Sequence, residues 1–152
     1  MLIQFTVTNF LSFDNETVFS MLADGGDGQH PDHLLINPAR KKEALVRGAA
    51  IYGANAAGKS NLIEALAFAQ NRIVKGSRGN QTIPVEPFRL DPSANDKASG
   101  FEFIFQHNEF TYSYGFRATK QRIEEEWLFA TSHRTHSREH PLFERTTDAE
   151  GK

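Results

Sequence analysis

Alternating apolar and polar side chains predict an antiparallel pair of strands at the start of the chain. Residues 2–9 alternate β-branched or aromatic side chains with polar ones, as half-buried strands do. Asp14-Asn15 supplies turn chemistry, and residues 17–22 predict the return strand. The next residues, 24–33, are rich in Gly, Asp and His but show no fixed ligand spacing, so they predict a loop and not a metal site.

The same period of two returns later in the chain and predicts a three-stranded antiparallel meander. Aromatic side chains recur at alternate positions in 101–105 and 110–116, and a turn at His107-Asn108 separates the two stretches. After a second turn at Thr119-Lys120, residues 123–129 predict the third strand. We expect this aromatic ladder to form a cross-strand core and not a platform for stacking bases.

Between these regions the apolar spacing becomes that of an amphipathic helix. From Ser60 onward apolar residues recur at helical intervals with no breaker before Gly76, which predicts about four turns. The preceding residues 47–52 form a short apolar run that ends at Gly53 and predict a buried strand. The expected order at this point is strand, Gly-rich loop and helix.

Polar stretches predict the connections. Residues 77–80 predict a loop. Residues 133–140 contain three His that would share a face only in a helix, and their Thr, Ser and nearby Pro141 favour an exposed connection over a zinc site. Residues 146–152 resemble the start of a hairpin turn, so we expect this chain to be part of a longer protein.

The loop between the predicted strand and helix carries the clearest chemistry. It matches the phosphate-binding pattern G-x-x-x-x-G-K-[ST] over Gly53-Ala54-Asn55-Ala56-Ala57-Gly58-Lys59-Ser60. Glycines let successive backbone N–H groups converge on phosphate oxygens, and the helix adds the positive end of its dipole. Lys59 is expected to reach the β- and γ-phosphates and is the one residue to which we assign a catalytic role. The Ser60 hydroxyl is expected to coordinate Mg²⁺.

Composition limits the remaining classes. The chain has 152 residues, of which 39% are hydrophobic and 24% charged, so it is not a charge-dominated disordered chain. It has no Cys, which excludes disulfides and Cys-based zinc sites, and its net charge of −2 argues against purely electrostatic binding of nucleic acid. No apolar run approaches the ~20 residues of a membrane helix, and the N-terminus lacks a secretory pattern. We expect a cytoplasmic protein with no membrane partner.

The surroundings of the loop favour ATP over GTP. Small GTPases and nucleotide kinases continue as repeated βαβ units, whereas this chain predicts antiparallel strands on both sides of its loop and helix. The guanine signature Asn-Lys-x-Asp is missing, because Asn95-Asp96-Lys97 has the wrong order. The expected ligand is therefore ATP with Mg²⁺.

Two segments, 1–13 and 51–62, resemble the start of an SMC/RecF-like ABC-type ATPase head. The closer similarity is to bacterial AAA-family ATP-binding proteins of abortive-infection and anti-phage systems. It includes Asn61 directly after the loop, so the expected nucleotide-binding set is Gly53, Ala54, Asn55, Ala56, Ala57, Gly58, Lys59, Ser60 and Asn61. Later segments agree with it: Pro87-Phe88-Arg89-Leu90, Phe101-Glu102-Phe103, Tyr112-Ser113-Tyr114-Gly115-Phe116, Glu126-Trp127-Leu128 and Leu142-Phe143-Glu144-Arg145.

The resemblance implies an α/β (α+β) P-loop NTPase fold. It is the lobe of an ABC-type head in which an antiparallel β-meander, 86–146, packs beside the strand–helix unit of 1–75. Residues 1–152 would then be the N-terminal part of one head domain. Relatives usually have Asn-Phe-Arg-Ser-Phe near the N-terminus, with a basic residue where this chain has Leu11. They also carry a Walker B strand and a signature motif, which this sequence lacks.

The resemblance implies a defence function with several partners. We expect an ATPase subunit that senses infection and controls a separate effector, a nuclease or toxin, with a second ATPase head in a homodimer or higher oligomer. By itself this chain is expected to be inactive. DNA is a further candidate partner, and a RecF/SMC-like DNA-repair ATPase or a nucleotide-switched scaffold with little hydrolysis is the alternative. Glu124-Glu125-Glu126 alternate faces on a strand, so they do not predict a nuclease metal site.

Overall fold

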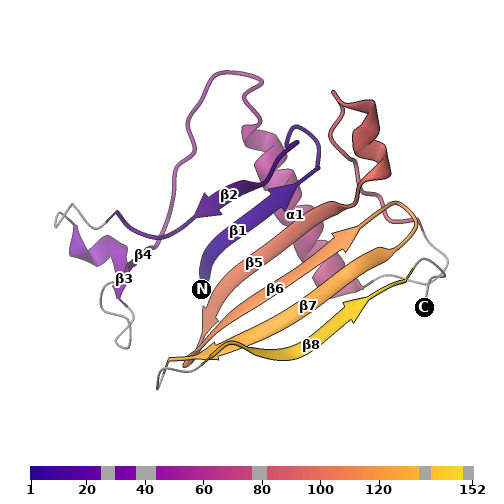
Figure 1. Ribbon diagram of the computed structural model, residues 1–152. Coiled ribbons are helices and arrows are strands. Elements are labelled where there is room, and N and C mark those ends of the chain that lie inside the picture. Colours follow the sequence, from indigo (N-terminus) through magenta and orange to yellow (C-terminus); the bar gives the residue numbers. More distant parts are fainter. Residues whose placement is uncertain (25–29, 37–43, 77–81, 134–137, 149–152) are drawn as a thin grey trace.

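A six-stranded antiparallel sheet forms the centre of the computed structural model, which describes residues 1–24, 30–36, 44–76, 82–133 and 138–148. The strand order is β2-β1-β5-β6-β7-β8 (Figure 1). The strands are β1 (Leu2–Thr8), β2 (Thr17–Ser20), β5 (Ser99–His107), β6 (Phe110–Ala118), β7 (Ile123–Ser132) and β8 (His140–Thr146). Helix α1 (Lys59–Lys75) lies behind the sheet in Figure 1, and β3 (Leu34–Ile36) and β4 (Ala44–Val46) form a separate hairpin.

The sequence periods correctly predicted most of these elements. The N-terminal pair is β1 and β2, the meander is β5 to β7, and the predicted helix is α1. The sequence did not reveal that β1 pairs directly with β5, with Phe5 opposite Phe103. The N-terminal pair and the meander therefore share one continuous sheet.

The reversal between β1 and β2 lies at Leu11-Ser12 and not at the predicted Asp14-Asn15. Phe10 and Phe13 exchange two backbone hydrogen bonds, of 2.9 and 2.8 Å, so they close a hairpin around the two residues between them. Both rings pack into or against the core, which requires the chain to reverse between them. Leu11 adopts the left-handed backbone conformation (φ 52°) that such a tight turn needs.

The core lies between α1 and one face of the sheet. Ala65 and Ala69 are fully buried on the helix, and such small side chains let its backbone approach the strands. The Phe68 ring contacts Phe101, which in turn stacks on Phe116 across β5 and β6 (centroids 5.1 Å apart in both pairs). This part of the aromatic ladder is core, as expected, and each buried Phe contributes roughly 1.5–3 kcal/mol to folding.

The buried strand predicted at 47–52 is wrong. These residues form no strand in the structure, and the Ile51 and Tyr52 side chains are 40% and 90% exposed. A buried strand needs neighbours that pair with its backbone N–H and C=O groups. None of the strands in the described ranges pairs with 47–52, so the apolar run has no sheet to join.

Several predicted connections lie partly or wholly outside the described residues. Residues 25–29 of the first loop, the whole of 77–80, and 134–137 of the His-containing connection are among them. The described end of the first loop, Pro31–His33, is a short 3-10 helix, η1. A second one, η2 (Pro92–Asp96), precedes β5. No group of three or more metal-binding side chains occurs within the described ranges.

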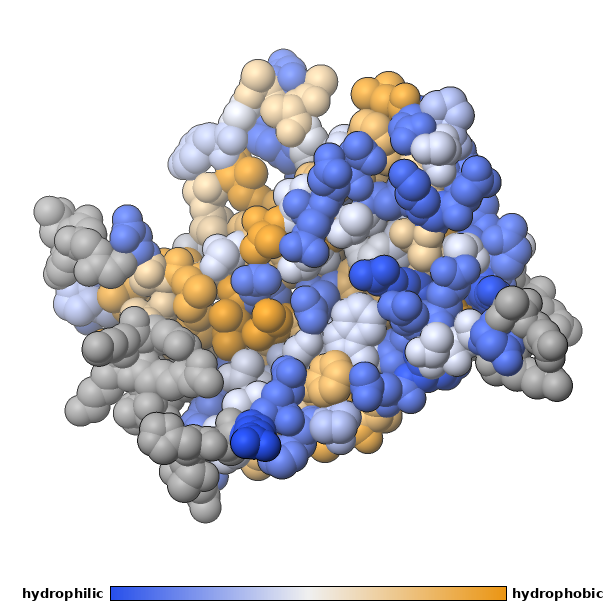
Figure 2. Space-filling view, viewed as in Figure 1, coloured by the Kyte–Doolittle hydropathy of each residue, from blue (hydrophilic) through white to orange (hydrophobic). Residues whose placement is uncertain are grey.

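The face of the sheet opposite α1 is mostly polar. Figure 2 shows hydrophilic residues over the meander and hydrophobic ones gathered near β2 and the β3–β4 hairpin. At its centre, the Glu102 carboxylate accepts hydrogen bonds from Ser113 (2.7 Å) and from the Trp127 indole (3.3 Å). The Trp127 ring covers Gly115 so closely that a Cβ there would overlap it.

Consecutive glutamates of β7 point to opposite faces, as the strand period predicted. Glu125 pairs with Arg117 at 3.3 Å, across β6 and β7. Glu126 accepts a hydrogen bond from Tyr114 and another from Arg145 (2.7 Å). Burial, followed by the bond to Glu126, raises the pKa of the Tyr114 hydroxyl well above its ordinary value, so the phenol stays protonated.

Asn9 joins the three segments that meet at the end of β1. Its Nδ2 donates to the carbonyls of Ala94 (2.9 Å) and Lys97 (3.0 Å), and its Oδ1 accepts from the Phe88 N–H (3.0 Å). Its own carbonyl accepts from the buried Ser99 hydroxyl. Asn9 is 4% exposed. Both N–H donors of its side chain and one of its two acceptor lone pairs are used in hydrogen bonds.

We expect Asn9→Ala to lower the free energy of unfolding by about 3 kcal/mol, because three buried backbone groups lose their partners. Asn71→Ala is the matched control, since Asn71 is exposed on α1 and makes one bond, to the Ala67 carbonyl. The control should stay within about 0.5 kcal/mol of wild type in urea unfolding. Equal urea midpoints for Asn9→Ala and wild type would show that Asn9 does not hold these segments together.

Candidate nucleotide-binding site

The predicted phosphate-binding loop lies directly before α1. Ala56 (φ 63°) and Gly58 (φ 86°) both adopt the left-handed conformation, so the backbone curls on itself between Gly53 and the helix. The loop and the first turn of α1 surround a hollow of about 420 Å³. The residues that line it are Asn55, Ala56, Ala57, Gly58, Lys59, Ser60 and Asn61. The structure thus brings seven of the nine predicted site residues around one space.

The other two predicted residues contact the lysine. Lys59 Nζ donates hydrogen bonds to the carbonyls of Gly53 (2.8 Å) and Ala54 (2.6 Å). The ammonium group therefore folds back over the loop that precedes it. These bonds are exposed to water, and a net contribution of about 1 kcal/mol each leaves the lysine free to exchange them for a phosphate.

The N-terminus of α1 is open to an anion. Gly58 is the N-cap and offers no side chain to the first N–H groups, and the first turn holds no acidic residue. A helix of 17 residues has a positive end of roughly half an elementary charge, carried by these uncapped N–H groups. This end of the helix faces the same hollow as Lys59.

Ser60 is the only metal ligand that the sequence predicted. It is exposed in the first turn of α1 and lines the hollow. Magnesium in nucleotide sites is commonly held by one or two protein oxygens together with phosphate oxygens and waters. A single hydroxyl at this position fits a metal ion that is shared with phosphates, and does not fit one held by protein alone.

The β1–β2 turn packs against the loop. Ser12 Oγ lies 3.0 Å from the position that a Cβ at Gly58 would occupy. Two features therefore favour glycine at position 58: the left-handed backbone conformation and the close approach of Ser12. The β1–β2 turn is itself anchored to the 86–89 segment, because the Leu11 N–H donates to the Glu86 carbonyl at 2.8 Å.

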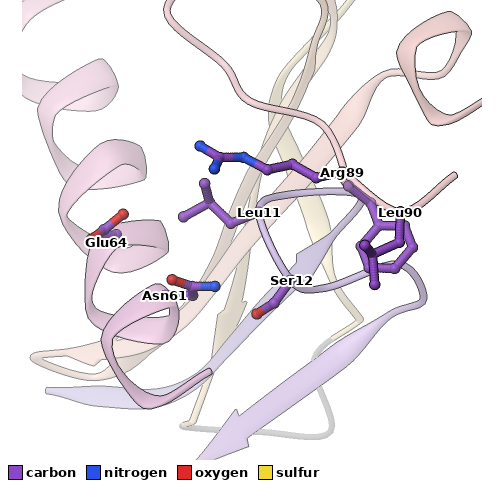
Figure 3. Close-up of a pocket in the computed structure, with 7 residues that line it drawn as sticks. Leu11, Ser12, Asn61, Glu64, Arg89 and Leu90 are labelled. Carbon is purple, nitrogen blue, oxygen red and sulfur yellow. The ribbon is translucent and has the colours of Figure 1, made fainter. Parts of the chain in front are cut away.

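A second cavity, of about 430 Å³, adjoins the loop (Figure 3). It is lined by Leu11, Ser12, Asn61, Glu64, Phe88, Arg89 and Leu90. These residues come from the β1–β2 turn, α1 and the segment before η2, and Asn61 lines both hollows. Sequence reasoning missed this cavity, although two of its segments are those quoted for the resemblance, Asn-Phe-x-Ser-Phe and Pro-Phe-Arg-Leu.

A larger hollow of about 790 Å³ lies between α1 and the sheet, away from the loop residues. Its lining is almost wholly apolar and includes Ile63, Val74, Phe105 and Leu128. It presents no charged side chain, and a triphosphate carries several negative charges. The loop hollow and not this groove therefore has the chemistry for nucleotide phosphates.

Residues 49–148 match the family described as "AAA domain, putative AbiEii toxin, Type IV TA system". The match spans 100 of the 152 residues and includes the whole loop and α1. The chain belongs to this family. An AAA domain is a P-loop NTPase domain, of a class that generally binds ATP with Mg²⁺, and the family name links this one to toxin–antitoxin defence.

The observed fold agrees with the family only at a coarse level. The structure is mixed α/β with an antiparallel sheet, and the loop is not preceded by a strand. No curated protein and no solved structure matches the chain. Within the described ranges, no helix is long and apolar enough to cross a membrane.

We expect Gly58→Ala to destabilise the protein by about 1–2 kcal/mol, because Ala must adopt φ 86° and its Cβ must displace Ser12 Oγ. Gly48→Ala is the control, since Gly48 has nothing within 4 Å of its Cβ position and no left-handed φ. Adding Ser12→Ala to Gly58→Ala should restore the steric part of the loss and leave the backbone part. Urea unfolding of wild type, the two single variants and the double variant measures the steric and the backbone parts of the loss. A Gly58→Ala protein as stable as Gly48→Ala would show that position 58 does not require glycine.

Proposed function

We propose that this chain is the nucleotide-binding part of an ATPase subunit in a bacterial anti-phage defence system. One observation carries the proposal: a complete phosphate-binding loop surrounds a hollow at the uncapped N-terminus of a 17-residue helix. The family match supports the biological setting, because its description names an abortive-infection toxin and a toxin–antitoxin system.

In this proposal the loop binds the phosphates of ATP and α1 supplies its positive end. Backbone N–H groups of residues 55–60 converge on the phosphate oxygens. Lys59 exchanges its two carbonyl partners for the β- and γ-phosphates and stabilises the charge that develops during their cleavage. Ser60 holds the Mg²⁺ ion, which neutralises phosphate charge when it is bound.

Hydrolysis needs groups that this sequence does not contain. No apolar strand ends in the Asp-Glu or Asp-Asp of a Walker B element. We therefore assign residues 1–152 to the N-terminal part of a head domain, in which 1–75 and 86–146 are joined through the β1–β5 pairing. The exposed run 47–52 is the segment that a further strand would cover. Alone, the chain should bind ATP·Mg²⁺ weakly and hydrolyse essentially none.

The proposed partners follow from the two states of a P-loop head. Contacts to the γ-phosphate exist before hydrolysis and are lost after it, so the head can present two shapes to another protein. A second copy of the head is the proposed partner for hydrolysis, and a separately encoded toxin or nuclease is the proposed effector. The cytoplasm, which holds both ATP and phage DNA, is the proposed location.

We expect Lys59→Ala to weaken ATP binding by about 100-fold, or roughly 2–3 kcal/mol, because a charge-assisted phosphate contact is lost. Lys75→Ala is the matched control, since it removes the same charge from the last turn of the same helix. Titration of the full-length protein with a fluorescent ATP analogue gives the three dissociation constants. A Lys59→Ala protein that binds as tightly as the control and keeps the wild-type fold would refute the loop as a phosphate site.

The defence function has its own test, in cells that carry the complete operon. We expect the wild-type operon to reduce the plating efficiency of at least some phages by 100-fold or more, and Lys59→Ala to abolish this protection. The expectation follows because the effector is released only through the nucleotide-dependent states of the head. An operon that protects against no phage of a broad panel, and whose deletion instead sensitises cells to DNA damage, would favour a DNA-repair ATPase.

A further inference from the structure

Arg89 projects into the second cavity from a backbone that is fixed against the β1–β2 turn. Its N–H donates to the Leu11 carbonyl (3.4 Å), and the Leu11 N–H donates to the carbonyl of Glu86 (2.8 Å), three residues before Arg89. In Figure 3 the Arg89 side chain extends over Leu11 toward α1, where Asn61 and Glu64 line the opposite wall. Arg89 thus lines the same cavity as Asn61, the residue directly after the phosphate-binding loop.

The two adjoining hollows differ in their chemistry. The loop hollow is lined by small residues, backbone and Lys59, which suits phosphates. The second cavity combines the apolar side chains of Leu11, Phe88 and Leu90 with an amide, a hydroxyl, a guanidinium and the carboxylate of Glu64. Apolar walls with a few polar groups are typical of sites for a base and a sugar, and a volume of about 430 Å³ lies within the roughly 300–1,000 Å³ of small-molecule sites.

We propose that Arg89 is a nucleotide-binding residue that contacts the α-phosphate of ATP, while the nucleoside end of ATP lies in this second cavity. The inference rests on the proposed function, because it assumes that the loop holds the β- and γ-phosphates. Asn61 lines both hollows, so a ligand that leaves the loop at this residue enters the cavity beside Arg89. The α-phosphate is the group of ATP that joins its phosphate and nucleoside ends.

Arg89 supplies the cation on the side of this cavity that faces the β1–β2 turn. The turn itself contributes Leu11 and Ser12 and no cation. Arg89 is bonded through its backbone to Leu11 and passes over its side chain. A positive charge therefore reaches the same cavity from the neighbouring segment.

Two carboxylates face Arg89. Glu86 forms an ion pair with it, and Glu64 lies across the cavity on α1. The Glu86 hydrogen bond and charge, with a smaller contribution from Glu64, raise the pKa of Arg89, so it stays charged. Both partners of the Glu86 pair are more than half exposed, and exposed pairs contribute little to stability. A phosphate, which accepts two parallel N–H bonds from a guanidinium, can therefore displace Glu86.

Three variants of the full-length protein test the assignment. Arg89→Ala removes the cation, and Glu86→Gln removes the negative charge that competes with phosphate for it. Arg117→Ala is the control, since Arg117 is another exposed arginine (59%, against 70% for Arg89), paired with Glu125 on the other face of the sheet. Isothermal titration with ATP, ADP and inorganic pyrophosphate, each with Mg²⁺, gives the affinities, and pyrophosphate offers only the two phosphates that the loop is proposed to hold. Urea unfolding of each variant verifies that it is folded.

Arg89→Ala should bind ATP and ADP about tenfold more weakly and pyrophosphate within about twofold of wild type. Glu86→Gln should bind ATP about two- to fivefold more tightly, and Arg117→Ala should match wild type. Unchanged ATP affinity in both Arg89→Ala and Glu86→Gln, with Lys59→Ala still defective, overturns the role of Arg89 and leaves the proposed function intact. An equal loss for pyrophosphate, which has no third phosphate, overturns the α-phosphate contact. A wild-type protein that binds no ATP instead refutes the proposed function itself.

Discussion

The buried, hydrogen-bonded amide of Asn9 is the constraint on which the arrangement of the candidate site depends. It lies where β1 ends, and it fixes the segment before η2 through Phe88, and η2 with its C-cap through Ala94 and Lys97. Because an amide offers two donors and one acceptor at fixed angles, Asp or Leu could not replace all three bonds. The β1–β2 turn begins directly after Asn9, and the 86–90 segment is bonded to Asn9 through the Phe88 N–H, so both keep their places beside the loop.

Backbone strain collects at the same place. Asn9, Leu11 and Ala56 all adopt left-handed conformations without being glycine, with φ between 51° and 63°. Asn tolerates this region because its short polar side chain can bond locally, whereas Leu and Ala adopt it at a cost of roughly 1 kcal/mol each. Such strain persists only where surrounding bonds over-determine the conformation. Here the Asn9 bonds, the Phe10–Phe13 hairpin and the buried aromatic rings supply them.

The sequence predicted the elements whose signal is local and missed those whose cause is distant. A period of two identified β1 and β5 to β7, and helical spacing identified α1, because one face of each element is buried. The pairing of β1 with β5 joins residues about a hundred positions apart, so no local pattern reveals it. The run 47–52 was misjudged because apolar character alone does not supply a partner strand.

The candidate site shows the same difference between features with a local cause and features with a distant one. The loop motif predicted a curled backbone directly before a helix, and the structure has one, since Gly and small residues determine this local geometry. The binding of phosphate by this loop stays a prediction. The sequence did not assign Arg89 or Ser12 to the site. Their positions beside the loop depend on the 86–90 segment and the β1–β2 turn, which Asn9 holds together. The motif Asn-Phe-x-Ser-Phe now has a physical reading: Asn9 bonds, Phe10 and Phe13 pack, and Ser12 touches the loop.

The covered glycine on the polar face has a practical consequence for spectroscopy. Trp127 is the only tryptophan in the sequence. Its ring packs directly on Gly115, and its indole N–H donates a hydrogen bond to Glu102. It lies on the side of the sheet away from α1, whereas the loop hollow lies at the start of that helix. Intrinsic fluorescence of this protein therefore reports the integrity of the meander, and emission from the indole distinguishes loss of the sheet from occupation of the loop.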